Sequence, residues 1–562
     1  MPSKERLSLL LGKGYFPREL PPVFRTDDFG RYIGEILQDW ENAGVFSKKA
    51  SGKLPGGGAK RDCYSYKVDS AEAEIISMPK RGYERRNLQI THPLPQALLS
   101  HELSENWRAV QKWLARQTYS LDEIQLSEQF ERSIKGINFP VHRAKKAYIE
   151  ATSDWLVRTD ISRFYPSIYT HSLPWAAYGK ERVKSQLKLY QGTLADRLDQ
   201  LIRACNRNQT IGIPIGPETS RIIAEVISSR IDADFQDAAP KIVRESVDRL
   251  QDDWFVGVDT LEKAETVLSI ISAIYRQYGL EINGQKTSIE HIVASVDASW
   301  ISELGAFLSH RPGAVHGARL KELLSLSLRL QSAAKSEPVV NYVLSTIEGH
   351  SFGAEDVEVL ESFLLKAAVI SPISMSHICR VILNLRSKTK RISRRRICER
   401  FTRLAERNLE NGNLYEAIWL LYTLRGLKTP LNSKRASEVA EVTPSSALAL
   451  VLLDLKSKRL CTRALPEASW TAQITKDKVR TDWTWLLGYE GIRHGWLKDP
   501  NNVMADDLFR PMAARNVVFY DPARNVPDST KFVRQRRIVR RKQSEEVENI
   551  LRSLRGFNFG VY

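Results

Sequence analysis

The chain has 562 residues, too many for one ordinary core, and this length predicts two or three domains. Its 42% hydrophobic and 9% aromatic content excludes a disordered protein, and no apolar run approaches the roughly 18 residues that a membrane span needs. Lys and Arg number 83 against 66 Asp and Glu, and the resulting net charge of +17 favours a polyanionic partner.

The five cysteines are scattered along the chain, form no CxxC pair and have no histidine cluster nearby. Structural zinc and a disulfide framework are therefore not expected, and the pattern fits a reducing cytoplasm. The first residues, MPSKERLSLLLGKGYF, lack the apolar core and small-residue cleavage site of a signal peptide. We expect a soluble, cytoplasmic protein.

The first half of the chain alternates strand-like and helix-like segments. A Gly- and Lys-rich loop at 47–61 comes first, and helical periodicity then dominates from 94 to 148. The segment DWLVRTD (154–160) roughly alternates apolar and polar positions and predicts a short strand that ends at Asp160.

The next segments predict a helix, a hairpin and a second helix. The residues at 218–235 place an apolar stripe on one helical face. The run VDRLQDDWFVGV (247–258) predicts two short strands folded about a polar turn, and 260–278 predicts an amphipathic helix that crosses back over them. Strands and helices on one sheet indicate an α/β domain.

Beyond about residue 305 the pattern becomes helical. From 318 to 460 amphipathic helices of ordinary length are separated by the short breaks SEP, GHSFG, SPIS, NGN and KTP. No strict sequence period is present, so a helical repeat is suggested rather than shown. We predict an α/β domain at 1–305, an all-α, repeat-like domain at 306–465 and a C-terminal extension with a basic tail at 466–562.

The C-terminal extension combines aromatic and basic residues. It contains a predicted strand, NVVFY (516–520), and four tryptophans that we expect to be core residues rather than platforms for base stacking: Trp470, Trp483, Trp485 and Trp496. Two basic runs, at 386–400 and 531–542, can neutralise phosphates. A solvated helix face or an acidic surface of another subunit is the alternative for both.

Three carboxylates stand at positions that suit phosphoryl transfer. Asp160 ends the predicted strand, and Asp252 and Asp253 occupy the hairpin turn about ninety residues later. Two-metal catalysis brings carboxylates from separate segments together around two divalent ions, and Mg²⁺ prefers such oxygen ligands. Spacing alone leaves the ordinary alternatives open, because a strand-end Asp is commonly a helix cap and a pair of Asp residues in a turn is commonly solvated.

The residues around these carboxylates resemble reverse transcriptases. The segment TDISRFYPSIYTHSLPWA (159–176) is similar to motif A, 209–225 with GIPIGPETSRIIAE to motif B, RLQDDWFVG (249–257) to motif C and GLEINGQKTSI (279–289) to motif D. Together with KGYFPRELPP (13–22), motif B resembles the abortive-infection and defence-associated branch of bacterial reverse transcriptases. This resemblance implies a fingers-palm domain over about 1–300, followed by a helical-repeat region.

The resemblance also implies roles in catalysis. Asp160 and Asp252 are implied as the principal ligands of two Mg²⁺ ions, supported by Asp253 and by the backbone carbonyl of Ile161. Lys286 in motif D is implied as the proton donor to the leaving pyrophosphate, with a solvent-facing lysine as the alternative.

A second set of residues is implied in binding the incoming dNTP. Tyr165 corresponds to the ring beneath the sugar that excludes a 2′-hydroxyl, unless it is a core aromatic. The segment 78–96 resembles the fingers, where two cations are expected to bind the triphosphate. The small residues of motif B allow close backbone approach to the base and template. These residues are Lys80 and Arg86 in the fingers, and Gly212, Pro214 and Gly216 in motif B.

The chain departs from the family pattern at two places. Leu250 stands where the family usually has an aromatic before the aspartates, with Gln251 as the intervening residue, and Ile215 stands where templated enzymes often carry Gln. Both positions touch the primer grip and the template-base platform. They leave metal binding intact and put ordinary templated copying in doubt.

Members of the resembled branch imply further expectations about priming and partners. Some extend DNA from a hydroxyl of their own chain, and a tyrosine phenol near the metals suffices as an acceptor; Tyr562 and Tyr15 are the candidates. A homo-oligomer and a bound noncoding RNA are also compatible with the resemblance. We therefore predict a DNA-synthesising antiviral polymerase, with a templated reverse transcriptase of a retron or mobile element as the first alternative. A non-catalytic nucleic-acid-binding scaffold is the second.

Overall fold

The computed structural model describes residues 1–51, 63–294, 299–309, 315–335, 337–348, 350, 352–389, 391–527 and 544–550. The basic run at 531–542 and Tyr562 lie outside these described residues, as does most of the Gly- and Lys-rich loop. None of the described helices has both the length and the apolar character to cross a membrane.

The N-terminal part consists of two helices and two antiparallel hairpins. The hairpin that we call the outer hairpin, β3–β4, pairs Glu74 with Ile90 and Pro79 with Arg85, so its tip lies at 80–84. The elements are α1 (Ser3–Gly12), α2 (Asp27–Asn42), β1 (Ser47–Ala50), β2 (Tyr64–Lys67), β3 (Glu74–Pro79) and β4 (Arg85–Ile90).

A four-stranded antiparallel sheet, the central sheet, follows the predicted pattern. Its strand order is β6-β7-β5-β8. The predicted strand at 154–160 and the predicted hairpin at 247–258 are both confirmed. The strands are β5 (Trp155–Thr159), β6 (Val247–Leu250), β7 (Asp253–Val258) and β8 (Ser288–His291).

Helices cover both faces of the central sheet because successive side chains of a strand point to opposite faces. Leu156 and Phe255 pack with Ile149 of α5 in a small cluster on one face, whereas Val157 and Val256 join the main core on the other. The helices of this half are α3 (Pro93–Glu105), α4 (Trp107–Leu114), α5 (Phe139–Ala151), α6 (Phe164–Ser167), α7 (Ser172–Tyr178), α8 (Lys180–Ser185), α9 (Leu187–Tyr190), α10 (Leu194–Ala204), α11 (Glu218–Ala238) and α12 (Leu261–Gln277).

The prediction of continuous helical structure from 94 to 148 is wrong in its middle. Residues 115–138 are irregular between α4 and α5. Here side chains take the place of helical backbone pairing, since Gln117 donates to the Ser120 carbonyl and Asp122 accepts from the amide of Asn138.

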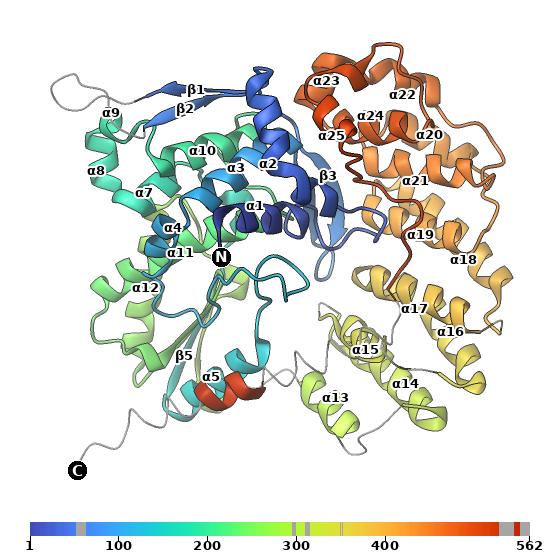
Figure 1. Cartoon of the computed structure of the whole chain (residues 1–562). Helices are drawn as coiled ribbons and strands as arrows, with labels where there is room; N and C mark the ends of the chain where they lie inside the picture. The colour runs from blue at the N-terminus through green and yellow to red at the C-terminus, as the bar shows by residue number, and fades with distance from the viewer. Residues whose placement is uncertain are drawn as a thin grey trace.

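The C-terminal half is mainly helical in its described residues, as predicted, with irregular segments such as 494–502 and 515–527. The breaks SPIS, NGN and KTP fall between α-helices, and the strictness of any repeat stays a prediction. In Figure 1 these helices lead from below the central sheet, through α14 and α17, to α23 and α25 beside the N-terminal part. They are α13 (Ser299–Ser309), α14 (Gly317–Ala333), α15 (Val339–Ile347), α16 (Ala354–Ile370), α17 (Met375–Lys388), α18 (Arg394–Glu410), α19 (Leu414–Gly426), α20 (Lys434–Val442), α21 (Ser446–Ser457), α22 (Glu467–Gln473), α23 (Lys476–Thr481), α24 (Thr484–Arg493) and α25 (Arg510–Ala514).

The segment after α25 returns to the N-terminal part and shares its core. Phe519 packs against Phe29 and Trp485 with ring centroids 5.3 and 5.2 Å apart, and the Asp521 amide donates to the Val23 carbonyl at 2.7 Å. Trp470 and Trp485 are buried, which confirms them as core residues. The predicted strand at 516–520 is wrong, since only an isolated bridge between Phe24 and Tyr520 forms there.

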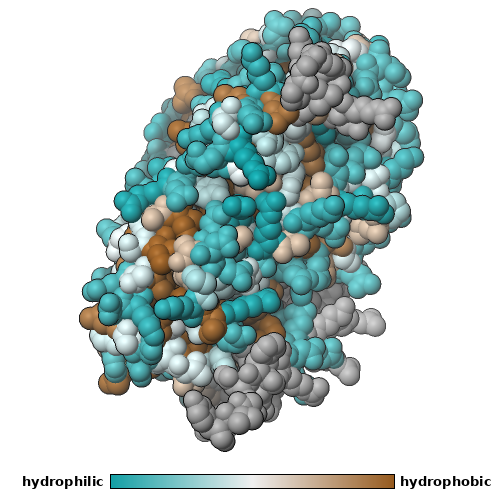
Figure 2. Space-filling model, turned by 90° about the vertical axis from the view of Figure 1, so that its left-hand side faces the viewer, coloured by the Kyte–Doolittle hydropathy of each residue, from teal (hydrophilic) through white to brown (hydrophobic). Residues whose placement is uncertain are grey.

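Two further features concern the outside of the protein. The stretch 544–550 is helical and lies beside α5 (Figure 1), where Glu546 pairs with Lys135 at 2.6 Å. The face in Figure 2 is mostly hydrophilic, with apolar patches interrupted by hydrophilic residues. The predicted homo-oligomer stays a prediction.

Candidate active site

Strand register brings the three predicted carboxylates to one end of the central sheet. Thr159 of β5 pairs with Trp254 of the antiparallel strand β7. Asp160, which follows Thr159, and Asp253, which precedes Trp254, therefore lie at the same end of the sheet. Leu250 pairs with Asp253, which leaves only Gln251 and Asp252 in the turn. The predicted convergence of residues 160, 252 and 253 is therefore present.

The tight turn is achieved by an unusual backbone at Gln251. Its φ of 58° lies in the left-handed region that two-residue hairpins require and that side chains other than Gly adopt at a cost. The Gln251 carbonyl accepts a hydrogen bond of 2.7 Å from the buried Arg249 guanidinium. Arg249 thus stabilises the strained turn through this hydrogen bond.

Arg249 belongs to a buried ion cluster that joins the turn to α11. Its guanidinium contacts Asp232 at 2.5 Å and Glu225 at 2.7 Å, and its side chain is completely buried. Burial disfavours the charged form of Arg249, but the two carboxylates overcome this effect and raise its pKa. The sequence analysis missed this residue, although a charged side chain in a buried strand was the signal that could have found it.

Protons are shared unequally among the carboxylates. Burial and the hydrogen bond with Asp160, together with the charges of Asp253 and Asp160, raise the pKa of Asp252 well above its ordinary value. Burial opposes ionisation of Asp160 too, yet the Asp252 hydrogen bond and Lys286 lower its pKa. The proton shared by this pair is therefore favoured on Asp252 and disfavoured on Asp160.

Asp253 is the exposed member of the three. Surrounding protein displaces water from it and raises its pKa, and the charge of Asp160 adds to the rise, whereas Lys286, Lys146 and Arg81 counteract it. Three acids and three cations from five chain segments therefore act on one another here. Such mutual perturbation is typical of functional sites.

Lys286 is tied directly to Asp160. It ends the short 3₁₀ turn η2 (Gly284–Lys286), and its ammonium forms an ion pair with the Asp160 carboxylate. The Asn283 amide also donates to the Asp160 backbone carbonyl at 2.7 Å. The structure therefore does not support the alternative of a purely solvent-facing lysine.

The three carboxylates are chemically suited to divalent metal ions, but in this structure they are not spaced closely enough to share one ion. Carboxylate oxygens are the ligands that hard cations take, and burial together with neighbouring carboxylates raises the pKa of Asp252 and Asp253. Within the described residues, however, no three acidic, His or Cys side chains are grouped closely enough to hold one ion. A metal ion bound to Asp160 would take the place of the Lys286 ammonium.

Tyr165 lies close to the carboxylates. Burial raises the pKa of its phenol, Arg221 opposes the rise and Asp252 adds to it, so the ring is within electrostatic reach of the turn. Its side chain is half-buried, and its ring contacts Phe164 edge-on at 5.7 Å. Both predicted readings, a core aromatic and a ring beside the site, describe part of this position.

The glycines of motif B have reasons within the chain itself. Gly212 has a φ of 89°, and a Cβ there would lie 3.2 Å from the Pro166 carbonyl; at Gly216 it would lie 2.6 Å from the ring of Pro17. Pro214 and the exposed face of this loop remain near Tyr165, whose carbonyl accepts from the Ile213 amide at 3.0 Å. Close approach of a nucleotide stays a prediction.

The outer hairpin supplies one cation that the sequence analysis missed. Lys80 pairs with Glu84 at 3.4 Å, and Arg86 has no ion pair among the described residues. Arg81 is the cation whose charge reaches Asp253 and Lys286. Sequence position could not separate these neighbours, because adjacent residues at a hairpin tip point in different directions.

The predicted priming residues differ in outcome. Tyr15 is completely buried, its hydroxyl donates to the Thr91 carbonyl at 2.5 Å, and burial raises its pKa. In this structure Tyr15 is a core residue and not available as an acceptor. Tyr562 lies outside the part of the chain that the structure describes.

The basic run at 386–400 is partly neutralised by acidic neighbours. Arg396 pairs with Glu361 at 2.7 Å and Arg395 with Glu399 at 2.9 Å. Arg391 and Arg394 are exposed. The alternatives of a phosphate-binding surface and a solvated helix face both remain predictions.

Residues 99–326 match the reverse transcriptase (RNA-dependent DNA polymerase) family, whose members generally use divalent metal ions. No curated protein sequence matches the chain.

Three solved structures are similar over parts of their length. Apo telomerase from Candida tropicalis truncated from its C-terminal domain has 11% identity, coverage of 48% of this chain and 57% of that one, and a TM-score of 0.27. Apo telomerase from Candida tropicalis has 11% identity, coverage of 80% and 76%, and a TM-score of 0.29. Telomerase from Candida albicans in complex with a TWJ fragment of telomeric RNA has 12% identity, coverage of 58% and 65%, and a TM-score of 0.26. The chain thus spans less than two thirds of the truncated Candida tropicalis telomerase and of the Candida albicans telomerase. The TM-scores are too low to indicate a common overall fold.

Proposed function

We propose that this chain, an RNA-directed DNA polymerase-like enzyme by its reverse transcriptase domain, makes DNA in bacterial antiviral defence. Its catalytic carboxylates are Asp160, Asp252 and Asp253. The observation that carries the proposal is their convergence from two distant segments, with Asp252 forced toward its protonated form. Crowded carboxylates of this kind gain stability when a cation binds.

The reaction is transfer of a nucleotidyl group. A hydroxyl oxygen forms a bond to the α-phosphorus of a dNTP, the bond to the bridging oxygen breaks, and pyrophosphate leaves. Two magnesium ions, when bound, activate the hydroxyl and neutralise charge on the leaving group. Asp160 and Asp252 are the residues to hold them, with Asp253 and the Ile161 carbonyl in support.

The remaining residues serve the nucleotide and the proton. Lys286 is suited to give a proton to pyrophosphate, since it stands beside Asp160. Arg81, with Lys80 and Arg86, is suited to bind the triphosphate, and Tyr165 to contact the sugar. The fit of Gly212, Pro214 and Gly216 to the base completes the proposed nucleotide site.

The defence assignment rests on the resemblance of 13–22 and of motif B, and on the helices that follow the catalytic half. Protein priming, untemplated synthesis, a noncoding RNA and a homo-oligomer belong to the same proposal. Tyr562 remains the priming candidate. The five free cysteines accord with the proposed cytoplasmic location.

A non-catalytic scaffold is supported by one specific observation. Lys286 already occupies Asp160, and the described residues offer no ready three-ligand metal cluster. A templated reverse transcriptase of a retron or mobile element is the other alternative, and it differs by requiring an added template and primer.

One incorporation assay separates these functions. The purified full chain is incubated with Mg²⁺ and each labelled dNTP, with and without template and primer, and then digested with protease. Label that stays with the protein until digestion supports protein priming, whereas label confined to the added primer supports templated copying. Absence of incorporation under every condition supports the scaffold.

Replacement of one carboxylate tests the site itself. Asp252→Ala removes a metal ligand, so we expect incorporation to fall by about 10³-fold or more. Asp259→Ala is the matched control, because Asp259 follows the other end of the same strand, is exposed and pairs only with Lys263. Full activity of Asp252→Ala would refute the assignment.

A further inference from the structure

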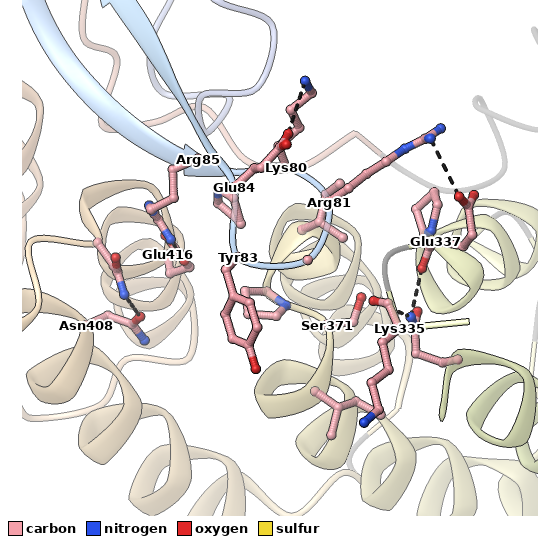
Figure 3. Close-up of a pocket in the computed structure, with 18 of the residues that line it drawn as sticks. Lys80, Arg81, Tyr83, Glu84, Arg85, Lys335, Glu337, Ser371, Asn408 and Glu416 are labelled. Carbon is pink, nitrogen blue, oxygen red and sulfur yellow. Dashed lines mark hydrogen bonds and ion pairs between the residues drawn. The ribbon is translucent and has the colours of Figure 1, made fainter. Parts of the chain in front are cut away.

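A polar cavity lies between the tip of the outer hairpin and the C-terminal helices. Its volume is about 410 Å³, toward the lower end of the range for ligand sites. Two ion pairs hold its walls together: Arg85 contacts Glu416 of α19 through both guanidinium nitrogens at 2.9 and 2.8 Å, and Arg81 pairs with Glu337 at 3.6 Å. Figure 3 shows these pairs on either side of the hairpin tip.

Tyr83 projects from this tip into the cavity. In Figure 3 its ring extends between Asn408 on one side and Ser371 and Lys335 on the other. The side chain lines the cavity and is fully exposed to solvent, and the preceding Gly82 has a φ of 56° that suits the tight tip of the hairpin. A large ring without packing contacts gains stability when another flat apolar surface covers it.

Unpaired cations accompany this ring. Lys335, just after α14, and Arg407, in the last turn of α18, line the cavity, are exposed and have no ion pair among the described residues. Each of them can contact an anionic group that enters the cavity. Asn411 and Asn413 add amide groups that can donate or accept hydrogen bonds.

The cavity adjoins the proposed nucleotide site. Lys80 and Arg81, which belong to that site in the proposed function, also line the cavity together with Tyr83. A strand that follows the outer hairpin from the nucleotide site would therefore pass Tyr83.

We propose that this cavity binds single-stranded nucleic acid, with one base stacked on Tyr83 and neighbouring phosphates on Lys335 and Arg407. A stacking ring beside cations is how proteins hold single strands without reading their sequence, and the volume is too small for a duplex. The inference rests on the proposed function, because it supplies the strand path that a polymerase needs.

Binding of a fluorescent single-stranded oligonucleotide to the full chain, followed by anisotropy, tests the inference. Tyr83→Leu should weaken binding about tenfold, the size of one lost base stack, while Tyr83→Phe keeps the ring and should bind as the wild type does. A double replacement, Lys335→Gln with Arg407→Gln, should lower the slope of log affinity against log salt by about 1.4, or ~0.7 for each phosphate contact.

The matched control is Lys321→Gln, since Lys321 is an exposed lysine at the other end of α14 that does not line the cavity. Its salt slope should stay close to that of the wild type. Equal affinity of Tyr83→Leu and Tyr83→Phe would overturn the proposal. Equal salt slopes for the double variant and for Lys321→Gln would overturn it too.

A photo-crosslink separates this inference from the proposed function. An oligonucleotide with a photoreactive pyrimidine should crosslink to Tyr83, as mapped by mass spectrometry, even in Asp252→Ala. Crosslinking without nucleotide incorporation by the wild type would leave the strand site standing and defeat the proposed function. Incorporation without a crosslink at 80–85 would defeat the strand site alone.

Discussion

The Tyr165 ring lies within electrostatic reach of Asp252, and its contact with the sugar of the incoming nucleotide is a proposal. Its alternative role as a core aromatic is only partly fulfilled, because the side chain is half-buried, whereas the adjacent Phe164 is buried. The two roles make different predictions for the same substitution.

Tyr165→Ala should relax the preference for dNTPs over rNTPs by about tenfold to a hundredfold, since the extra hydroxyl no longer meets a ring. Competition between labelled dNTP and rNTP measures this ratio. Tyr165→Phe retains the ring and serves as the control. An unaltered dNTP-to-rNTP ratio in Tyr165→Ala, with activity retained, would show that Tyr165 is only a core aromatic.

At Lys286 the prediction concerns a proton. Burial disfavours its charge, but the Asp160 hydrogen bond and carboxylate overcome this effect and raise its pKa, which favours the protonated ammonium. Lys286→Ala should therefore slow incorporation by about 10²- to 10⁴-fold if the group is a general acid.

The pH profile of the rate distinguishes that role from simple neutralisation of Asp160. In the wild type the rate should fall only as pH rises above the raised pKa, and this alkaline limb should be missing from Lys286→Ala. Lys263→Ala, at an exposed ion pair, should change neither the rate nor the profile. A limb that persists in Lys286→Ala would assign the proton elsewhere.

Among elements, the β6–β7 hairpin depends on α11 through Arg249. Arg249→Met leaves Glu225 and Asp232 buried without their cation, which should cost about 3–5 kcal/mol of unfolding free energy. It also releases the Gln251 carbonyl, so incorporation should fall together with stability. Denaturant unfolding and the incorporation assay measure the two effects.

Two further variants keep this prediction decisive. Arg276→Met, an exposed arginine of α12, should change stability by less than about 0.5 kcal/mol. Combining Arg249→Met with Glu225→Gln and Asp232→Asn removes the unpaired charges and should recover much of the stability, but not the turn. Full activity in this triple variant would show that Arg249 does not position Asp252.

Sequence patterns predicted the elements whose period is clear and whose neighbours are local. The strand before Asp160, the hairpin of Asp252 and α11 have such periods, and each was located within a few residues. The same reasoning failed at 115–138, where buried side-chain hydrogen bonds replace helical ones, and at 516–520, where pairing depends on Phe24 almost five hundred residues away. The Arg249 cluster and the direction of Arg81 also depend on tertiary contacts that no local pattern contains.

Across the whole molecule, the outer hairpin is joined to the C-terminal helices through a buried carboxyl group. Glu74 of β3 accepts hydrogen bonds from the Ser445 hydroxyl at 2.6 Å and the Ala447 amide at 3.0 Å, at the start of α21. Burial raises the pKa of Glu74 to about 7, although these hydrogen bonds oppose the rise. The interface therefore carries a protonation equilibrium near neutral pH.

The expected pH dependence follows from the sign of that shift. The folded pKa lies above the ordinary value near 4.5, so the stabilisation is complete below about pH 4.5 and is lost as pH rises through 7. Glu74→Gln mimics the neutral form and should remove about 3 kcal/mol of this decline in unfolding free energy. Glu41→Gln, at an exposed site, should leave the decline unchanged, and an equal decline in Glu74→Gln would contradict the assignment.

The predicted division at 305 and 465 stays a prediction, but packing across it is extensive. The core of the N-terminal part includes Trp485 and Phe519 from the last segment, and no periodicity in the sequence indicates that pairing.

The return of the segment around Phe519 to Phe16 and Phe29 also has a consequence for biosynthesis. A ribosome releases the N-terminal residues first, and domains ordinarily fold as they emerge. Here Phe16, Phe29 and Trp40 must wait for partners near residues 485–520, so the catalytic half leaves the exit tunnel with an uncovered apolar surface. Premature termination at any point before those residues yields a nascent polypeptide that lacks part of its own interior and is a substrate for chaperones.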